Sequence, residues 1–324
     1  MRSNSFTASG NIRLIALLIL FAIMIVLPFV FPGRYYWRVL TQMAYFIVFA
    51  GSFALLFGGT NQLFLCVAAL GGISAYVSGL ISLNYGLSPW LTVIIGSIVS
   101  AAVAAALSFV SNVRKLGVAF VAILTLSFQL IFENVVTGLV SITGGDTGFR
   151  PPPLQMAFLE TVLGRELGHY YIAITLAILS VTARYWLMER SKWGLVMRAV
   201  KSEELASEVL GINVRRVKVI VASFSGFIIG AAGALYGYFN GLVAPIYYSF
   251  ASVDILTQVM AVFGGMASVM GPVIGSAIFT YINENVRYLG PISLSVYGAV
   301  LVVLFSVFRN GLVSVLKRWT NLIF

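Results

Sequence analysis

Long apolar runs dominate this sequence and leave few folds open to it. Each run holds roughly 18 or more residues, enough for a helix to cross a hydrocarbon core of about 30 Å. Backbone polar groups in lipid must be bonded internally, and the period-2 alternation of a barrel is missing, so the runs are predicted to be helices. The predicted spans are 12–31, 39–57, 63–83, 89–111, 116–141, 170–188, 217–241 and 292–308.

One further apolar region, 253–286, is interrupted by Gly264, Gly265, Gly271 and Pro272. Because glycine and proline are costly inside a helix, the region is predicted to form two short helices or a re-entrant pair. Such interruptions are tolerated where protein or a cavity surrounds them, and they often mark a transport pathway. The sequence therefore predicts an all-α polytopic transmembrane bundle of about 9–10 spans, with broken or re-entrant helices near the C-terminal third.

The composition agrees with a membrane protein, since only 9% of the residues are charged and 60% are hydrophobic. The net charge is +10, but the basic residues lie between the apolar runs and form no interleaved basic and aromatic surface. No nucleic-acid partner is therefore predicted. We expect one transmembrane domain over residues 1–324, with membrane lipid around it.

The basic residues predict the orientation of the chain. They gather in the loop 189–218 and are missing from loops 58–62, 84–88 and 242–250. Because Lys and Arg concentrate in cytoplasmic loops, residues 189–218 are predicted to be cytoplasmic. Counting spans from that loop places both the N- and the C-terminus in the cytoplasm.

Signatures of enzymes are nearly absent. The sequence holds one cysteine and one histidine, and no carboxylate pair lies at helical spacing inside a predicted span. Without a nucleophile and base or a set of metal ligands, neither an intramembrane enzyme nor a metal site is predicted, and we expect no cofactor. The phosphate-binding Gly-x-x-x-x-Gly-Lys-Ser/Thr loop is also missing, so ATP hydrolysis is not expected in this chain.

Polar residues line one side of the span 116–141. Thr125, Gln129 and Glu133 follow one another at intervals that place them on one helix face, and Asn134 stands beside Glu133. A carboxylate inside a span is a candidate for a translocation pathway. The alternative is a carboxylate that only hydrogen-bonds a neighbouring helix, and both interpretations stay open.

Asn61 and Gln62, at a glycine-flanked junction between two spans, form an equally ambiguous pair of polar residues. They are retained as pathway candidates.

The stretch "KSEELASEVLGINVRRVK", residues 201–218, concentrates charge in an otherwise apolar chain. Ser202 is predicted to cap a helix over 203–210, and Gly211 stands where a left-handed C-terminal cap is expected. Helical spacing gathers the apolar residues of this helix on one face and its carboxylates on the other. Since so short a helix is marginal in water, it needs a partner, which is either this protein's own surface or another protein. A solvated loop is the alternative.

The stretch 194–237, "GLVMRAVKSEELASEVLGINVRRVKVIVASFSGFIIGAAGALYG", resembles the cytoplasmic coupling region of branched-chain amino acid ABC transporter permeases. "TGGDTG" at 143–148, "VAPIYYSFASVDILTQVMAVFGGMASVMGPVIGSAIF" at 243–279 and "FRNGL" at 308–312 extend the resemblance, which is nearest to the M-type of the two paired permeases. Two departures are the run 58–79, which lacks the family's usual histidine, and the closing motif, which lacks its common proline.

The resemblance implies an inner-membrane permease subunit of a bacterial or archaeal ABC importer, which moves branched-chain amino acids or a related small polar or amphipathic solute. It implies two ATPase subunits, a second homologous permease and an extracytoplasmic solute-binding protein as partners. The residues that match the coupling motif are Glu203, Glu204, Ala206 and Gly211, and the glycines and proline of the broken region match the family's glycine-rich segment. The alternative is an ion- or proton-coupled secondary transporter that uses Glu133 without an ATPase.

Overall fold

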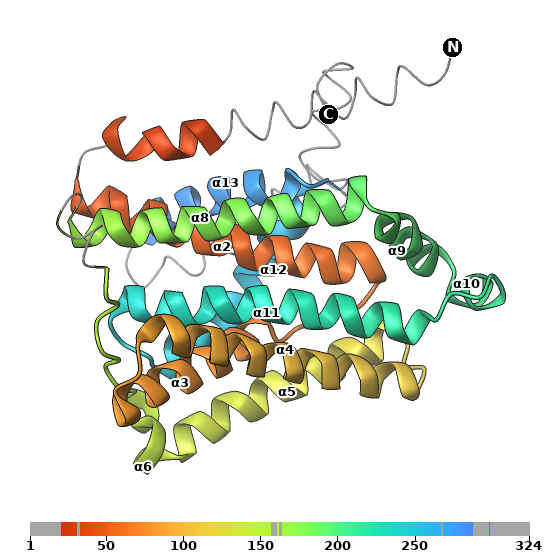
Figure 1. Cartoon of the computed structure of the whole chain (residues 1–324), viewed down its shortest axis with the longest axis horizontal. Helices are drawn as coiled ribbons and strands as arrows, with labels where there is room; N and C mark the ends of the chain where they lie inside the picture. Colours follow the sequence, from red (N-terminus) through yellow and green to blue (C-terminus); the bar gives the residue numbers. More distant parts are fainter. Residues whose placement is uncertain are drawn as a thin grey trace.

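The computed structural model describes residues 21–30, 33–156, 161, 164–266, 268–287 and 298 of the chain. Helices dominate this part, and no strand forms in it beyond an isolated bridge between Phe149 and Val243. Six of its helices are long and apolar enough to cross a membrane, and they pack in one bundle (Figure 1): α2 (Arg34–Thr60), α3 (Val67–Tyr85), α4 (Pro89–Val113), α5 (Val118–Gly138), α8 (Arg165–Tyr185) and α11 (Val214–Asn240). The all-α polytopic bundle is therefore confirmed.

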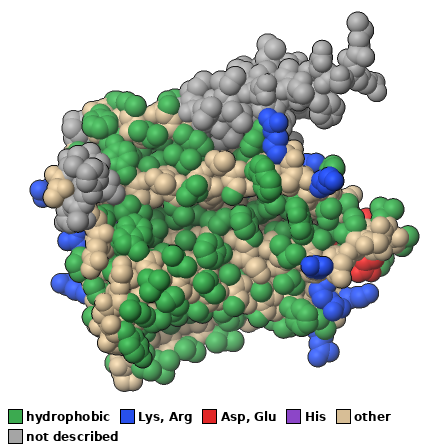
Figure 2. Space-filling view, viewed as in Figure 1, with side chains coloured by type: hydrophobic (Ala, Val, Ile, Leu, Met, Phe, Trp, Pro, Cys, Tyr) green, Lys and Arg blue, Asp and Glu red, His purple; other side chains and the backbone are tan. Residues whose placement is uncertain are grey.

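Two of the predicted spans extend beyond the described residues. The described part of 12–31 is a short apolar helix, Phe21–Val30. The span 292–308 lies outside the described residues, apart from residue 298, as does the closing motif 308–312. Figure 2 shows hydrophobic side chains over the middle of the face in view, with Lys and Arg gathered toward its ends, as expected for a chain that crosses a membrane.

The start of α3 differs from its prediction. The sequence suggested a span from residue 63, but residues 61–66 form no helix and α3 begins at Val67. Asn61 ends α2 with a left-handed backbone (φ 57°), and this turns the chain back into the bundle. Asn is among the few residues that adopt this conformation at modest cost. The helix α3 therefore begins inside the protein, with its first N–H groups buried.

Small residues let α11 approach its neighbours closely. A Cβ atom added at Gly226 would lie 2.5 Å from the Cβ of Ala104 in α4. One added at Gly233 would lie 2.3 Å from the Cα of Gly71 in α3. Both distances are shorter than real Cβ atoms tolerate, so glycine is what permits the backbones to come this near.

The region 253–286 is broken, as predicted. It contains the end of a π-helical turn, η4 (Phe250–Asp254), followed by α12 (Ile255–Gly264) and α13 (Gly271–Arg287). The two α-helices pack against each other and against α2. Together they form a pair that enters the bundle, reverses and returns.

The reversal between α12 and α13 depends on glycine. A Cβ at Gly264 would lie 1.8 Å from the carbonyl oxygen of Gly271, and a Cβ at Gly271 would lie 2.0 Å from that of Gly265. Gly265 itself has φ +99°, a conformation that side chains disfavour. Pro272 lies in the first turn of α13, where its missing N–H costs no helical hydrogen bond.

Long-range contacts identify the two ends of the bundle. At one end the Nζ of Lys201 donates to the carbonyl oxygen of Gly58, near the end of α2. At the other, the hydroxyl of Tyr35, near the start of α2, donates to Glu284 in α13 at 2.7 Å. The pair α12 and α13 therefore returns to the end at which α2 begins. The side of the membrane that each end faces stays a prediction.

Candidate functional site

The charged loop 189–218 contains two short helices that project from one end of the bundle (Figure 1). The first, α9, covers Lys192–Ser202, and the second, α10, covers Glu204–Val209. Ser202 is the last residue of α9, and the N-cap residue of α10 is Glu203, which makes no side-chain cap hydrogen bond. The predicted Ser202 cap is therefore wrong, because α9 extends through that residue.

The C-terminal end of α10 agrees with its prediction. Gly211 has φ +82°. Its N–H donates to the carbonyl oxygen of Glu208 at 3.0 Å, and the N–H of Ile212 donates to that of Ser207 at 3.0 Å. These two bonds form a Schellman motif, in which a glycine in the left-handed conformation closes the helix.

The apolar face of α10 points away from the bundle. The exposed fractions of Leu205, Val209 and Leu210 are 67%, 87% and 78%, and Ala206 is exposed as well. Ser207, on the other side of the helix, is buried. We call Leu205, Ala206, Val209 and Leu210 the α10 apolar face. Two partners were predicted for this face, the protein's own surface or another protein. The described part of the protein's own surface does not cover it.

Glu204 links α10 to the bundle. Its Oε1 accepts a charge-assisted hydrogen bond from the Nζ of Lys218 in α11 at 2.6 Å. The side chain of Lys218 is only 8% exposed, while that of Glu204 is 48% exposed. Glu203 is exposed and carries no ion pair in the part of the chain that the structure describes. The two neighbouring carboxylates therefore have different surroundings.

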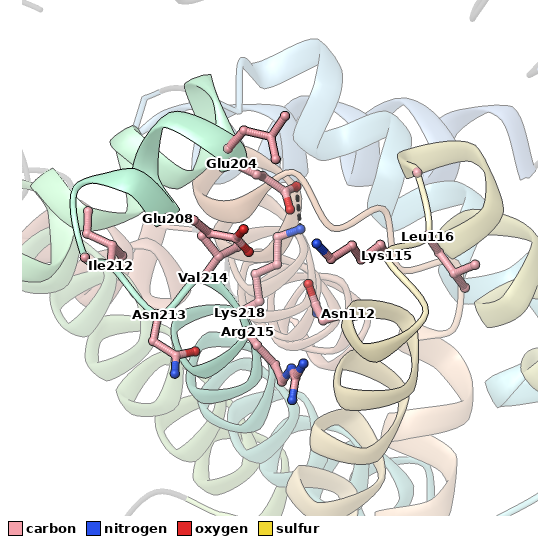
Figure 3. A pocket seen from close by; sticks show the side chains of 13 residues that line it. Asn112, Lys115, Leu116, Glu204, Glu208, Ile212, Asn213, Val214, Arg215 and Lys218 are labelled. Carbon is pink, nitrogen blue, oxygen red and sulfur yellow. Dashed lines mark hydrogen bonds and ion pairs between the residues drawn. The ribbon is translucent and has the colours of Figure 1, made fainter.

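A cavity of about 650 Å³ lies between α10 and the loop that joins α4 to α5. Glu204, Glu208, Lys115, Arg215 and Lys218 line it, and Figure 3 shows the first and last of these joined by their ion pair. The cavity thus brings carboxylates and cations together at the end of the bundle from which α10 projects.

The polar face of α5 binds the backbone of the broken segments. The Oγ1 of Thr125 accepts from the N–H of Leu65 at 2.9 Å. Gln129, fully buried, accepts from the N–H of Ala69 at 2.6 Å and donates to the carbonyl oxygen of Tyr248 at 2.9 Å. These bonds satisfy groups that an interrupted helix leaves without intrahelical partners.

Glu133, one turn further along α5, is partly exposed. Its Oε1 accepts from the N–H of Phe250 at 2.6 Å and from the Nε2 of Gln129 at 2.9 Å. These are the contacts expected of a carboxylate that bonds a neighbouring segment. They leave its role in a pathway untested. The neighbouring Asn134 is exposed and donates to the carbonyl oxygen of Leu130 in its own helix.

Asp254 is a site residue that was not predicted from the sequence. This carboxylate is fully buried, and its Oδ1 accepts from the N–H groups of Val67 and Ala68 at 2.6 and 3.2 Å. It therefore caps the start of α3, where the positive end of the helix favours an anion. The span boundaries hid it, because Asp254 falls in the broken region.

Gln62 is buried where three helices meet. Its Nε2 donates to the Oγ1 of Thr60 at 2.9 Å and to the carbonyl oxygen of Lys218 at 3.1 Å, and its Oε1 accepts from the Oγ of Ser108 at 2.6 Å. The neighbouring Asn61 is only partly buried. The structure thus places Gln62 beside α11 and α4, while Gln129 and Glu133 lie beside α3 and η4.

A second missed residue, Arg184 in α8, supports the turn between α12 and α13. Its guanidinium donates to the carbonyl oxygen of Met266 at 2.8 Å and lies 3.5 Å from that of Val269. Among the described residues, no group of three or more His, Cys, Asp or Glu side chains could hold a metal ion.

A bundle of long apolar helices, with shorter helices interrupted inside it and a short helix projecting from one end, is the architecture of a multi-pass membrane protein. The comparisons agree: the chain belongs to the family described as branched-chain amino acid transport system / permease component, whose model matches residues 35–307. The resemblance that the sequence motifs indicated is therefore confirmed.

The relatives are permeases named for different solutes. The high-affinity branched-chain amino acid transport system permease protein LivM of Escherichia coli is 26% identical over 278 residues, which are 78% of this chain and 64% of that protein. The fructose import permease protein FrcC of Rhizobium meliloti is 26% identical over 231 residues, 70% of this chain and 63% of that protein. The ribose import permease protein RbsC of Escherichia coli is 26% identical over 176 residues, 53% of each chain.

The matched part of the chain thus spans 64% of the length of LivM and 63% of the length of FrcC. No solved structure matches the chain.

Proposed function

We propose that this chain is the transmembrane permease subunit of an ABC importer in the inner membrane, and that separate ATPase subunits hydrolyse the ATP. Its solute is a branched-chain amino acid or a related small polar or amphipathic molecule. The family and the LivM relative support this solute class. The fructose and ribose permeases among the relatives are the reason for the wider class.

The observation that carries the proposal is the exposed α10 apolar face. Apolar side chains that a helix holds outward into water indicate a partner surface. On this proposal, Glu203, Glu204, Ala206 and Gly211 belong to the segment that docks on an ATPase subunit. Two such subunits, a second homologous permease and an extracytoplasmic solute-binding protein complete the transporter. Closure of the ATPases moves α10, and the bundle rocks between its outward-open and inward-open states.

The translocation pathway is proposed to pass where α3, η4 and α12 meet inside the bundle. Helices interrupted within a membrane protein expose helix ends and polar groups that a solute uses. The candidates on the side of α3 and η4 are Gln129, the partly exposed Glu133 and the exposed Asn134. Asn61 and Gln62, at the junction of α2 and α3 beside α11 and α4, are candidates nearer to α10. Gly264, Gly265, Gly271 and Pro272 form the turn between α12 and α13, whose flexibility is proposed to serve the movement.

The proposal places α10, and with it both chain termini, on the cytoplasmic side. A periplasmic reporter enzyme fused after residue 324 is expected to be inactive, and a cytoplasmic reporter at the same position is expected to be active. The opposite result would reverse the orientation.

Purification from native membranes tests the proposal itself. A tagged chain extracted in mild detergent is expected to carry two ATPase subunits and a second permease, identified by mass spectrometry and by the mass of the intact complex. A chain that purifies alone and takes up solute in liposomes with only an ion gradient would support the secondary-transporter alternative. The hydrogen bonds of Glu133 to Phe250 and Gln129 give that alternative no additional support.

A further inference from the structure

The helix α10 holds to the bundle through few side-chain contacts. In the described part of the chain, the pair of Glu204 and Lys218 is the one side-chain hydrogen bond that joins α10 to a transmembrane helix. Lys218 is almost fully buried, so the pair is screened less than a surface ion pair. The apolar residues of α10 point outward and contribute little to its attachment.

The backbone of Lys218 makes the next contact. Its carbonyl oxygen accepts from the Nε2 of Gln62 at 3.1 Å. The same amide also bonds Thr60 at the end of α2 and Ser108 in α4. Both the oxygen and the nitrogen of the Gln62 amide are therefore hydrogen-bonded. Because these bonds join it to three helices at once, a movement of one helix is expected to displace the Gln62 side chain and its other partners.

Gln62 belongs to the non-helical segment 61–66, which leads directly into α3. Further along this segment, the N–H of Leu65 donates to Thr125. At its end, Asp254 and Gln129 bind the first N–H groups of α3. An unbroken series of contacts therefore extends from α10 to the interrupted helices inside the bundle.

We propose that Glu204, Lys218 and Gln62 are positioning residues that transmit the movement of α10 to the start of α3. This inference rests on the proposed function, because an ATPase must move α10. It gives the two adjacent carboxylates different tasks: Glu203 faces the partner, whereas Glu204 holds α10 to α11. Without the ion pair, α10 still docks, but its displacement is lost in the loop that contains Gly211.

The single cysteine provides a reporter at the right place. Cys66 is buried at the N-cap position of α3. The probe is N-ethylmaleimide, and its reaction with Cys66 is followed by mass spectrometry of this chain in the complete transporter, with and without ATP and vanadate. A movement of the start of α3 changes the rate at which the buried thiol is alkylated.

The test compares E204Q and K218M with E208Q. Glu208 lies on the same helix and lines the same cavity, yet it has no ion pair in the described part of the chain. E204Q and K218M are expected to reduce the ATP-induced change in Cys66 alkylation about tenfold, a size typical of substitutions in coupling networks. E208Q is expected to leave that change intact. K218M alters the same ion pair from α11, outside the docking segment, and is expected to bind the ATPase subunits as the unchanged chain does. Combining E204Q with K218M is expected to add no further loss, because either change alone breaks the pair.

Gln62 is tested through S108A, since removal of the buried amide endangers the fold. S108A removes one contact of the Gln62 side chain and is expected to weaken the ATP-induced change without affecting ATPase binding. The exchange E204K/K218E, which restores a pair of opposite charges, is expected to recover part of the response.

Several results would overturn the proposal: an unchanged response in E204Q, an equal loss in E208Q, or weaker ATPase binding in K218M, which would show that the ion pair serves docking. A lack of any ATP-induced change at Cys66 in the unaltered transporter would also contradict it. Failure of the unaltered chain to bind ATPase subunits is a different result, since it contradicts the proposed function itself.

Discussion

Because the α10 apolar face is exposed, its effect on ATPase binding can be measured separately from its effect on the stability of the chain. We consider the double substitution V209S/L210S. These side chains are 87% and 78% exposed, so their loss is expected to change the free energy of unfolding of the isolated chain by no more than about 0.5 kcal/mol. If an ATPase subunit buries them, the same change removes much of the docking free energy.

The size of the effect on binding follows from the free energy gained when the two side chains are buried. Full burial of a Val or Leu side chain contributes about 1.5–3 kcal/mol. Since association recovers only part of this, the double substitution is expected to weaken binding by about 2–4 kcal/mol. The dissociation constant of the permease and ATPase complex would then rise by about 30- to 1000-fold.

Two assays on the same protein test this expectation. Thermal unfolding in detergent measures the stability, and titration with purified ATPase subunits measures the affinity. The control I246S replaces an apolar residue in η3 (Pro245–Tyr248) that is 69% exposed at the other end of the bundle, and it is expected to alter neither. A dissociation constant for V209S/L210S within about twofold of that of the unaltered chain would refute docking through this face.

Three further substitutions test the packing and the buried hydrogen bonds by thermal unfolding. G233A forces a Cβ to within 2.3 Å of Gly71 and is expected to cost about 1–3 kcal/mol, whereas G138A meets nothing within 4 Å and is expected to be neutral. D254A leaves two buried N–H groups of α3 without an acceptor and is expected to cost about 1–3 kcal/mol for each, while D254N keeps an oxygen acceptor and most of the stability. R184M is expected to destabilise the turn between α12 and α13 by about 1–3 kcal/mol, since two carbonyl groups lose their donor. Equal melting temperatures within any of these comparisons would contradict the corresponding contact.

Local signals in the sequence were sufficient to predict the positions of most of the long helices. Apolar runs placed α2, α4, α5, α8 and α11 within a few residues of their observed bounds, because the length and hydrophobicity that suit a segment to a membrane are properties of that segment itself. Glycine and proline marked the break between α12 and α13, and Gly211 marked the end of α10. These features depend on residues close together in the chain.

The contacts inside the site depend on residues far apart in the chain, and the sequence did not reveal them. Asp254 caps α3 across 187 positions, and Gln62 meets Lys218 across 156. The span 63–83 was predicted to be helical from residue 63, yet α3 begins only at Val67, where Asp254 accepts from its first N–H group, and Thr125 binds the non-helical Leu65 before it. Ser202 satisfied the local rule for a cap, but the chain continued α9 through it. Apart from the Ser202 cap, tertiary partners decided these points.

Reconstitution in liposomes tests the central claim most directly. The complete transporter, with its ATPase subunits, partner permease and binding protein, is supplied with ATP on the side of the ATPases, and accumulation of radiolabelled leucine is measured. We predict accumulation that requires ATP, stops with vanadate and falls strongly in V209S/L210S. Leucine accumulation driven by a proton gradient in liposomes that contain this chain alone would contradict the account.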